Sequence, residues 1–380
     1  MVWKAECPGS VPWLVIMPVT IYEVAQKAGV GIGTVSRVLN NSTQISPATR
    51  ARVLQVIDEL NYQPHAMAQG LARKKSLAIA VLVPFFTGHF YVELLKGIQQ
   101  ATAAHKYDLI LYSIEDLQDK DFYLKRALQQ RRVDGVVLVS LPLTEANAKE
   151  LHRRKLPLVL VDAFHPDFDS ITVNNRTGAQ TAVQHLIRLG HKRLAMITGH
   201  RASNPAQLRD AGFQQALAAA GLKAPENLIV SSDGLSAEAA TVNDGFNKET
   251  GYLAMQQLLQ LNGKRPSAVF VASDIQALGA IKAVQESGLR IPQDIAIVGF
   301  DDIELAEYVG LTTVRQPMLQ MGKRAVERLM TLINNPKARH RHWRIDTELV
   351  VRESCGAKSR GVSAARMKNK IKKSNQVRSL

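Results

Sequence analysis

Residues 19–40 read VTIYEVAQKAGVGIGTVSRVLN, and this stretch decides how the amino-terminal part of the chain folds. Thr20 and Glu23 have the spacing of a capping box, in which the two side chains satisfy the first free amides of a helix. Gly29 is expected to end that helix, and a second helix is predicted shortly afterwards over Ile32–Leu39. Two short helices joined by a glycine-containing turn are typical of a helix-turn-helix.

A third helix is expected to brace the first two. Ser46 can cap it, Pro47 suits its first turn, and its apolar residues extend to Leu60. The second helix then offers four polar side chains to a DNA groove, namely Thr34, Ser36, Arg37 and Asn40. A small helical bundle without a partner is the alternative that the pattern leaves open.

The formal net charge of +15 on 380 residues is unevenly placed. Residues 17–76 carry +4 and residues 356–380 carry +8, which leaves +3 for the large middle of the chain and no net charge for residues 1–16. A basic front and a basic tail around a nearly neutral body favour a polyanionic partner such as nucleic acid. Ordinary solvated surface charge is the alternative.

The composition excludes several classes of protein. Two cysteines near opposite ends of the chain cannot build a disulfide framework, so a reducing compartment is expected. No apolar run approaches the roughly 20 residues of a membrane span. The sequence therefore predicts a cytoplasmic protein without a membrane partner.

Residues 77–354 repeat one unit, an apolar run followed by an amphipathic helix. Strands are predicted at Ala78–Pro84, Leu109–Ser113, Gly135–Ser140, Leu158–Asp162, Leu194–Thr198, Ala268–Ala272 and Ile295–Phe300. Helices are predicted between them, at Tyr91–Ala104, Gly178–Leu189, Arg209–Ala219, Gly251–Leu261 and Ile275–Ser287. Because the runs are almost wholly apolar, the strands are expected in parallel sheets covered on both faces. Their number predicts two doubly wound lobes, with ligands beyond the carboxyl ends of the strands.

Several motifs resemble, in order, those of the lactose/galactose-repressor family. They are Val19–Ala25, Thr34–Asn40, Leu60-Asn61-Tyr62-Gln63-Pro64, Gly190-His191-Lys192-Arg193-Leu194-Ala195 and Val298-Gly299-Phe300-Asp301-Asp302. The resemblance implies an all-α helix-turn-helix headpiece followed by a two-lobed α/β effector domain like that of periplasmic binding proteins. It also implies that Met17 is the true start of the protein.

The resemblance sets the expected divisions of the chain. They are an extension at 1–16, the headpiece at 17–64, a hinge helix at 65–76, the two-lobed domain at 77–354 and a basic, disordered tail at 355–380. Lobe 1 is expected over 77–173 and 303–318. Lobe 2 is expected over 174–302 and 319–354.

The resemblance also implies DNA contacts at Thr20, Tyr22, Ile32, Gly33, Thr34, Ser36, Arg37, Asn40, Tyr62, His65, Ala68 and Leu71. Arg37 can donate two hydrogen bonds to a guanine edge. Leu71, in the hinge, matches the leucine that relatives insert at the central base step of a palindromic operator. A homodimer is expected, because a palindromic site needs two headpieces.

Between the lobes, the resemblance implies an effector site at His89, Phe90, Asp162, Arg209, Phe246, Asp274 and Asp301. Hydrogen-bonding groups beside an aromatic face suit a polyhydroxylated molecule, so a sugar or a sugar derivative is expected. Asp162 and Asp301 have a structural alternative, since each can cap a following helix.

The expected function is a sequence-specific, allosteric transcriptional regulator, a repressor of carbohydrate-related genes. No enzyme activity, cofactor or metal is expected, because no catalytic arrangement stands out and His340-Arg341-His342 lacks further ligands. Gly29–Gly33 imitates a dinucleotide fingerprint but follows a helix instead of a strand. Two alternatives stay open: a global carbon regulator that responds to a phosphorylated partner protein, and a sugar-binding protein without a role on DNA.

Overall fold

The computed structural model describes residues 19–40, 42–62, 75–84, 88–114, 119–128, 132–223, 225–236, 242–261 and 265–357. The chain forms two compact units that divide between Ser76 and Leu77. The expected extension at 1–16, the start at Met17, most of the expected hinge with His65, Ala68 and Leu71, and the tail beyond residue 357 lie outside the described residues.

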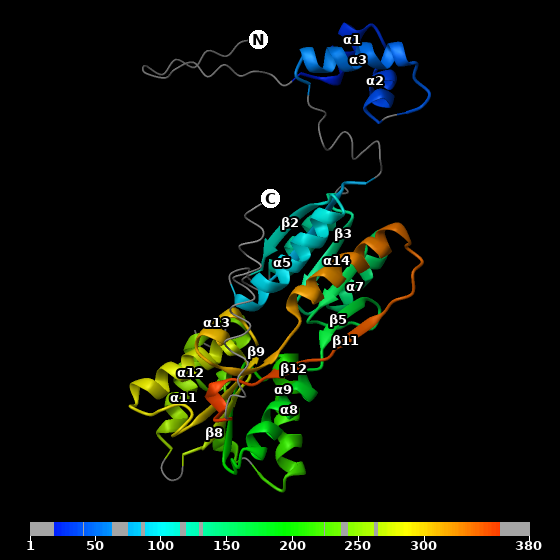
Figure 1. Cartoon of the computed structure of the whole chain (residues 1–380). Helices are drawn as coiled ribbons and strands as arrows, with labels where there is room; N and C mark the ends of the chain where they lie inside the picture. Colours follow the sequence, from blue (N-terminus) through cyan, green and yellow to red (C-terminus); the bar gives the residue numbers. More distant parts are fainter. Residues whose placement is uncertain are drawn as a thin grey trace, which may run out of the picture. The chain divides into compact units, whose positions relative to one another are not determined.

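The first unit contains three helices around a small apolar core. They are α1 (Ile21–Ala28), α2 (Ile32–Leu39) and α3 (Pro47–Glu59). The capping box of Thr20 is present, and Gly29 ends α1 in the left-handed conformation with φ 61°. Val24, Val35 and Val53 are fully buried between the helices, because each helix turns its apolar face inward. This confirms the predicted helix-turn-helix (Figure 1).

The second unit, from Leu77 onward, contains two six-stranded sheets. The first has the order β11-β5-β4-β3-β1-β2 and is parallel throughout. Its strands are β1 (Ala78–Val83), β2 (Asp108–Ser113), β3 (Gly135–Val139), β4 (Leu158–Val161), β5 (Asp169–Val173) and β11 (His342–Ile345). This sheet is the centre of lobe 1.

The second sheet, the centre of lobe 2, has the order β12-β10-β9-β8-β6-β7. Its strands are β6 (Leu194–Thr198), β7 (Ile229–Ser231), β8 (Ala268–Val271), β9 (Ala296–Asp301), β10 (Thr312–Arg315) and β12 (Glu348–Val350). Only the β10–β12 pair is antiparallel among the pairings of the described strands.

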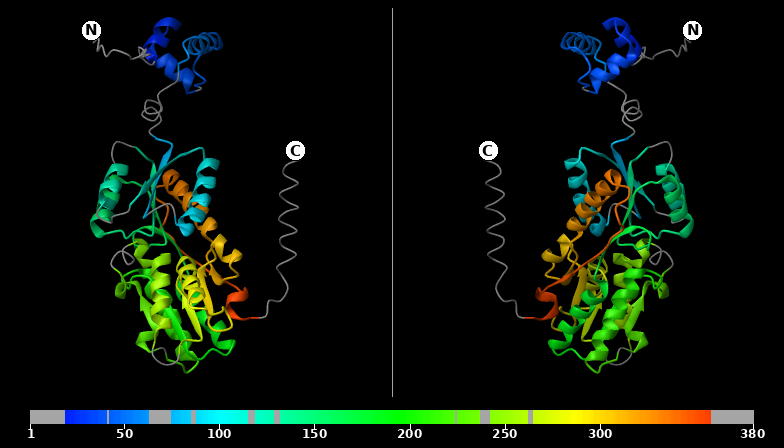
Figure 2. Two further views of the ribbon diagram at one scale, coloured as in Figure 1. Left: turned by 90° about the vertical axis from the view of Figure 1, so that its left-hand side faces the viewer. Right: turned by 90° about the vertical axis from the view of Figure 1, so that its right-hand side faces the viewer.

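Helices cover both faces of each sheet, as Figures 1 and 2 show. Lobe 1 has α5 (His89–Ala104), α6 (Lys120–Leu128), α7 (Glu145–Arg154) and α14 (Met318–Asn334). Lobe 2 has α8 (Asn175–Arg188), α9 (Asn204–Ala219), α11 (Lys248–Leu259), α12 (Asp274–Glu286) and α13 (Glu304–Tyr308). Short 3₁₀ turns lie at η2 (Glu226–Leu228), η3 (Ser232–Gly234), η4 (Val242–Gly245) and η5 (Glu353–Cys355). The predicted pair of doubly wound lobes is therefore confirmed.

The expected division of the last third of the chain between the lobes was wrong. Residues 303–315 belong to lobe 2, because α13 packs in its core and β10 pairs with β9. α14 and β11 belong instead to lobe 1, where α14 packs on α5 and β11 pairs with β5. The chain then returns to lobe 2 at β12. The cause is that the chain crosses between the lobes three times, and the two later crossings follow short, partly polar strands.

No helix in the described part of the chain is both long enough and apolar enough to cross a membrane.

Candidate functional site

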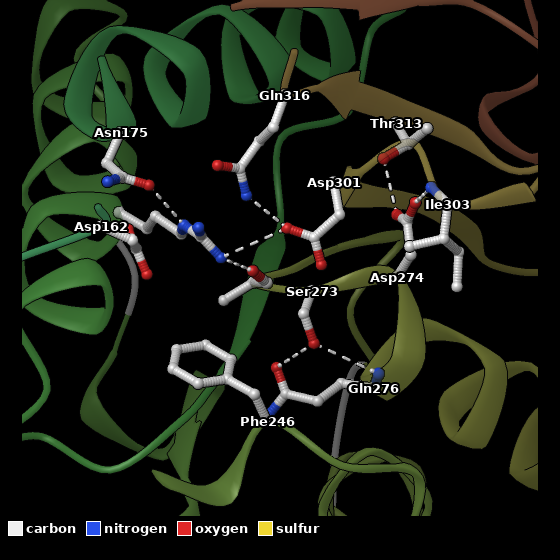
Figure 3. A network of polar contacts seen from close by, with 12 residues as sticks. Asp162, Asn175, Phe246, Ser273, Asp274, Gln276, Asp301, Ile303, Thr313 and Gln316 are labelled. Atoms are coloured by element: carbon white, nitrogen blue, oxygen red, sulfur yellow. Dashed lines mark hydrogen bonds and ion pairs between the residues drawn. The ribbon is translucent and has the colours of Figure 1, made fainter. Parts of the chain in front are cut away.

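A cavity of about 270 Å³ lies between the lobes, at the carboxyl ends of the strands. Six of the seven expected effector residues line it: His89, Phe90, Asp162, Arg209, Phe246 and Asp301. They come from both lobes, since His89 and Phe90 begin α5 and Asp162 follows β4, whereas Asp301 ends β9. Figure 3 shows Asp162, Phe246 and Asp301 around the same space. Residues far apart in the sequence thus meet because parallel strands end at one edge.

Arg209, on α9, is the fixed cation of this cavity. Its Nε donates to Asn175 Oδ1 over 2.8 Å, and Nη1 donates to the carbonyl of Ala272. Nη1 also lies 3.9 Å from Asp301 Oδ1, and the guanidinium carbon lies 3.9 Å from the centre of the Phe300 ring. Burial lowers the pKa of Arg209 and the neighbouring carboxylates oppose that shift. An arginine stays charged under these conditions, so the cavity contains a positive charge held in one orientation.

Two carboxylates, Asp162 and Asp301, face this cation. Ser140 Oγ donates to Asp162 Oδ2 over 2.9 Å, and Gln316 Nε2 donates to Asp301 Oδ1 over 2.6 Å. Burial raises the pKa of both carboxyls, to about 6 for Asp301, while Arg209 acts in the opposite direction. Both aspartates have positive φ, 54° at Asp162 and 125° at Asp301. Such strained backbone is found where the surrounding structure holds side chains for a function.

Asp274, the seventh expected effector residue, does not line the cavity. It is fully buried, and it accepts from the Thr313 hydroxyl at Oδ1 and from the Ile303 amide at Oδ2. These bonds join the start of α12 to α13 and β10, so Asp274 holds lobe 2 together beneath the cavity (Figure 3). Its neighbour Ser273 lines the cavity in its place.

Several cavity residues escaped sequence reasoning. Tyr91, on α5, donates to Asn243 Oδ1 over 3.2 Å and so connects lobe 1 to lobe 2. Gln316 also lines the cavity, although the strand that precedes it was not predicted. The polar and apolar wall of the cavity also includes Ser273, Ile275, Ile303 and Lys248. A signal for Tyr91 was available, because it directly follows the expected pair His89-Phe90 in the sequence.

The headpiece presents α2 as its candidate DNA-binding surface. Ile32 is 40% exposed, and Gly33 and Arg37 are also exposed, while Val35 and Val38 face the core. No acidic side chain of the described headpiece pairs with Arg37. A helix face with an unpaired arginine and few large side chains suits a major groove.

The other expected DNA contacts within the described headpiece lie in α2, at its end, at the start of α1 or, for Tyr62, after α3, whereas His65, Ala68 and Leu71 lie outside the described residues. Tyr22 is 67% exposed, Thr34 and Ser36 are half-buried, and Asn40 Nδ2 donates to the carbonyl of Ser36. Thr20, which is exposed, uses its hydroxyl in the capping box. Tyr62 is only 9% exposed and packs in the headpiece core, so the structure does not place it on this surface.

The histidines of the His340-Arg341-His342 stretch are engaged separately. His340 Nδ1 lies 3.1 Å from Asp169 Oδ2, and His342 Nδ1 lies 2.9 Å from Ser170 Oγ. Among the described residues, no group of three or more histidine, cysteine or acidic side chains is placed to hold a metal ion.

Comparison with known proteins identifies the family. Residues 20–65 match the family described as bacterial regulatory proteins, lacI family, and residues 183–355 match the periplasmic binding protein-like domain. The catabolite control protein A of Priestia megaterium is 36% identical over 324 residues, which are 84% of this chain and 93% of that protein. The chain belongs to the LacI family of bacterial regulatory proteins. The ribose operon repressor of Escherichia coli K12 is 35% identical, over 88% of this chain and 99% of that protein.

Solved structures of other regulators have the same fold. The lac repressor dimer bound to operator and the anti-inducer ONPF has a TM-score of 0.76 at 29% identity, over 89% of this chain and 99% of that chain. The complex of the transcriptional regulator CelR with cellobiose has a TM-score of 0.65 at 30% identity, over 88% and 99% of the two chains. The expected resemblance is therefore confirmed, and this LacI-family chain is a DNA-binding transcriptional regulator with an effector domain.

Proposed function

We propose that this LacI-family regulator is a homodimeric, cytoplasmic repressor whose affinity for an inverted-repeat operator is set by a neutral, polyhydroxylated effector. The observation that carries the proposal is the cavity between the lobes, where Arg209 lies between two carboxylates and beside the Phe246 ring. These groups come from both lobes, so a ligand that binds them favours one arrangement of the lobes over another. This gives the cavity a binding role and not a catalytic one.

The chemistry of the cavity favours a ligand with many hydroxyl groups. Asp162 and Asp301 accept hydrogen bonds, and Gln316 Oε1 is a buried acceptor without a partner among the described residues. A sugar hydroxyl can donate to such groups and accept from Arg209. Asp162 and Asp301 beside Arg209 disfavour a phosphorylated or carboxylate ligand at this point of the cavity, because their negative charges would repel a further one.

Exposed apolar side chains support association of two copies. In lobe 2, Leu305, Tyr308 and Val309 are 37%, 74% and 45% exposed in and beside α13. In lobe 1, Val92 and Leu111 are each 37% exposed. Clustered apolar exposure of this kind marks protein interfaces. A second copy of the chain is the partner that also supplies the second headpiece of a palindromic site.

Selection of duplexes from a random-sequence library tests the DNA part of the proposal. The wild-type dimer should enrich an inverted repeat, and Arg37→Ala should lose about 1–3 kcal/mol of discrimination between that repeat and scrambled DNA. Arg52, which is also exposed and lies on α3, gives the matched control Arg52→Ala, which should weaken binding to both duplexes alike. If Arg37→Ala keeps the wild-type preference, the assignment of Arg37 is wrong.

A thermal-shift screen of neutral and phosphorylated sugars tests the effector part. Ribose, cellobiose and their relatives are suitable first probes, and a neutral sugar should both stabilise the protein and change its affinity for the selected operator. Arg209→Met should remove both effects. A response confined to phosphorylated sugars, or to a phosphorylated protein, would contradict the neutral effector and leave the DNA part intact.

A further inference from the structure

We propose that lobe 1 carries a second, sequence-independent contact surface for DNA. It lies at the amino ends of the strands of the first sheet, which is the end of lobe 1 at which the chain enters the lobed unit. We call this surface the linker edge. It consists of six exposed basic residues, Lys106, Arg132, Lys155, Lys337, Arg339 and Arg341. The inference rests on the proposed binding of an operator by the headpiece, and it adds contacts to the phosphates that flank that operator.

The parallel topology brings these six residues to one edge. Ala78 pairs with Asp108, Val136 with Leu158, and His342 with Ser170, so the strands of lobe 1 all begin at the same side of the sheet. Each of the six basic residues lies in a segment that directly precedes one of these strands. Figure 1 shows α14 running toward the end of lobe 1 at which the chain enters.

The charges of the linker edge are available to a partner. In the described part of the chain, none of the six side chains forms an ion pair, whereas the nearby Arg153 and Arg154 share Glu150. Two acidic residues at the linker edge are engaged or buried within the protein. Asp134 accepts from the Leu77 amide over 3.0 Å, and Asp169 is fully buried.

Two exposed acids, Asp108 and Asp167, also lie at this edge. The six basic residues outnumber them, so the edge has a positive potential that favours a polyanion.

Two of the lysines occupy backbone positions at which glycine would make the protein more stable. Lys106 and Lys155 follow α5 and α7 with φ 55° and 53°, in the left-handed region that costs energy for any residue with a Cβ. The corresponding helix ends of lobe 2 carry glycine, at Gly190, Gly221 and Gly288. Lobe 1 therefore keeps two lysine side chains at a conformational cost, which indicates that they contribute something other than stability.

The covalent connection keeps the linker edge near DNA that the headpiece holds. Fourteen residues, 63–76, separate Tyr62 of the headpiece from Leu77. Such a connection spans at most about 50 Å even when fully extended. In both lobes the carboxyl ends of the strands face the cavity between the lobes. The amino ends of the lobe 2 strands therefore lie at the opposite end of the lobed unit from the linker edge. Duplex DNA is thus the polyanion within reach of this edge.

The test measures affinity of the full-length dimer for the selected operator in duplexes of about 20 and about 50 base pairs, over a range of salt concentrations. In the wild-type protein, the longer duplex should bind more tightly and with a steeper salt dependence. In Lys106→Gly/Lys155→Gly, the dimer loses four lysines, so the slope of log affinity against log salt on the longer duplex should fall by up to about 4, because each neutralised phosphate contributes about 0.9. The same variant should unfold at a higher temperature, since glycine relieves the two left-handed positions.

Two further variants sharpen the outcome. Arg339→Ala/Arg341→Ala should show the same loss of flank dependence without the gain in thermal stability. Lys192→Ala/Lys223→Ala removes two exposed lysines from the corresponding edge of lobe 2 and should bind both duplexes like the wild type. Equal slopes for wild type and linker-edge variants, or an equal loss in the lobe 2 control, would overturn the inference. If the wild-type protein selects no operator at all, the proposed function has failed instead.

Discussion

Replacing Arg209 with methionine leaves two carboxylates of the cavity without their cation. Methionine keeps an unbranched side chain, but it ends before the guanidinium carbon that lies 3.9 Å from the centre of the Phe300 ring. Asn175 Oδ1 and the carbonyl of Ala272 lose their donor, and Asp301 loses a guanidinium nitrogen 3.9 Å away. The variant therefore removes the charge and hydrogen bonds of Arg209 together with its contact to Phe300.

The loss of unfolding free energy in Arg209→Met should depend on pH, because the pKa of Asp301 is about 6. Removing one partner of a buried ion pair costs about 3–5 kcal/mol, so we expect a loss of about 4 kcal/mol at pH 8. Burial raises the pKa of Asp301 to about 6 in the folded protein, against an unfolded value near 3.9. A raised carboxyl pKa contributes stability below the unfolded value, and this contribution is lost as pH rises through 6.

The expected difference between the losses of stability at pH 5 and at pH 8 follows from the direction of this pKa shift. Without Arg209, which lowers the pKa of Asp301, that pKa rises further. At pH 5 the Asp301 carboxyl is mostly neutral in both proteins, so the loss should be smaller than at pH 8 by about 1–2 kcal/mol.

Urea unfolding followed by far-ultraviolet circular dichroism, at pH 5 and pH 8, measures both losses. Asp301→Asn is the second variant of a double-mutant cycle, and in its background Arg209→Met should cost much less at pH 8. Equal losses at the two pH values, or strict additivity in the cycle, would refute the argument that Arg209 acts by compensating Asp301.

Two further predictions concern stability. Thr20→Ala should cost about 1 kcal/mol of headpiece stability, because the capping box of α1 is lost; faster hydrogen exchange of the first α1 amides would show it, and unchanged exchange would contradict it. Gly97→Ala should destabilise the lobed unit by about 1–3 kcal/mol, because a Cβ there would lie 2.1 Å from the Leu319 carbonyl where α5 meets α14. The urea midpoint measures this loss, and Gly234→Ala, in the same unit and with nothing within 4 Å, should show none.

Much of the local structure could be predicted from the sequence. The capping box, Gly29 and the apolar spacing predicted α1 and α2, and the bounds of α2 were predicted to the residue. The seven apolar runs all form strands. Strands β5, β7, β10, β11 and β12 were missed, because they are short and most of their sequences, such as TTVR at Thr312–Arg315, mix polar with apolar residues.

The candidate site could be predicted in part. Asp162, Arg209 and Asp301 line the cavity as expected, because each follows or faces the carboxyl end of a strand that was predicted. Asp274 does not line the cavity although it was expected to, since a helix start turns neighbouring side chains in different directions, and Ser273 and Ile275 on either side of it line the cavity instead. Tyr62 was expected to contact DNA, whereas the structure packs its ring in the headpiece core with 9% exposure.

The sequence by itself determined the helix-turn-helix, the alternation of strands and helices, and the edge at which ligand groups collect. These depend on caps, breakers and apolar periodicity, which act over a few residues. Only the tertiary structure decided that α14 and β11 return to lobe 1 and that Tyr91 reaches Asn243 across the cavity. Strand pairing and contacts between lobes join segments up to about 170 residues apart, and their free energy depends on shape complementarity that no local pattern records.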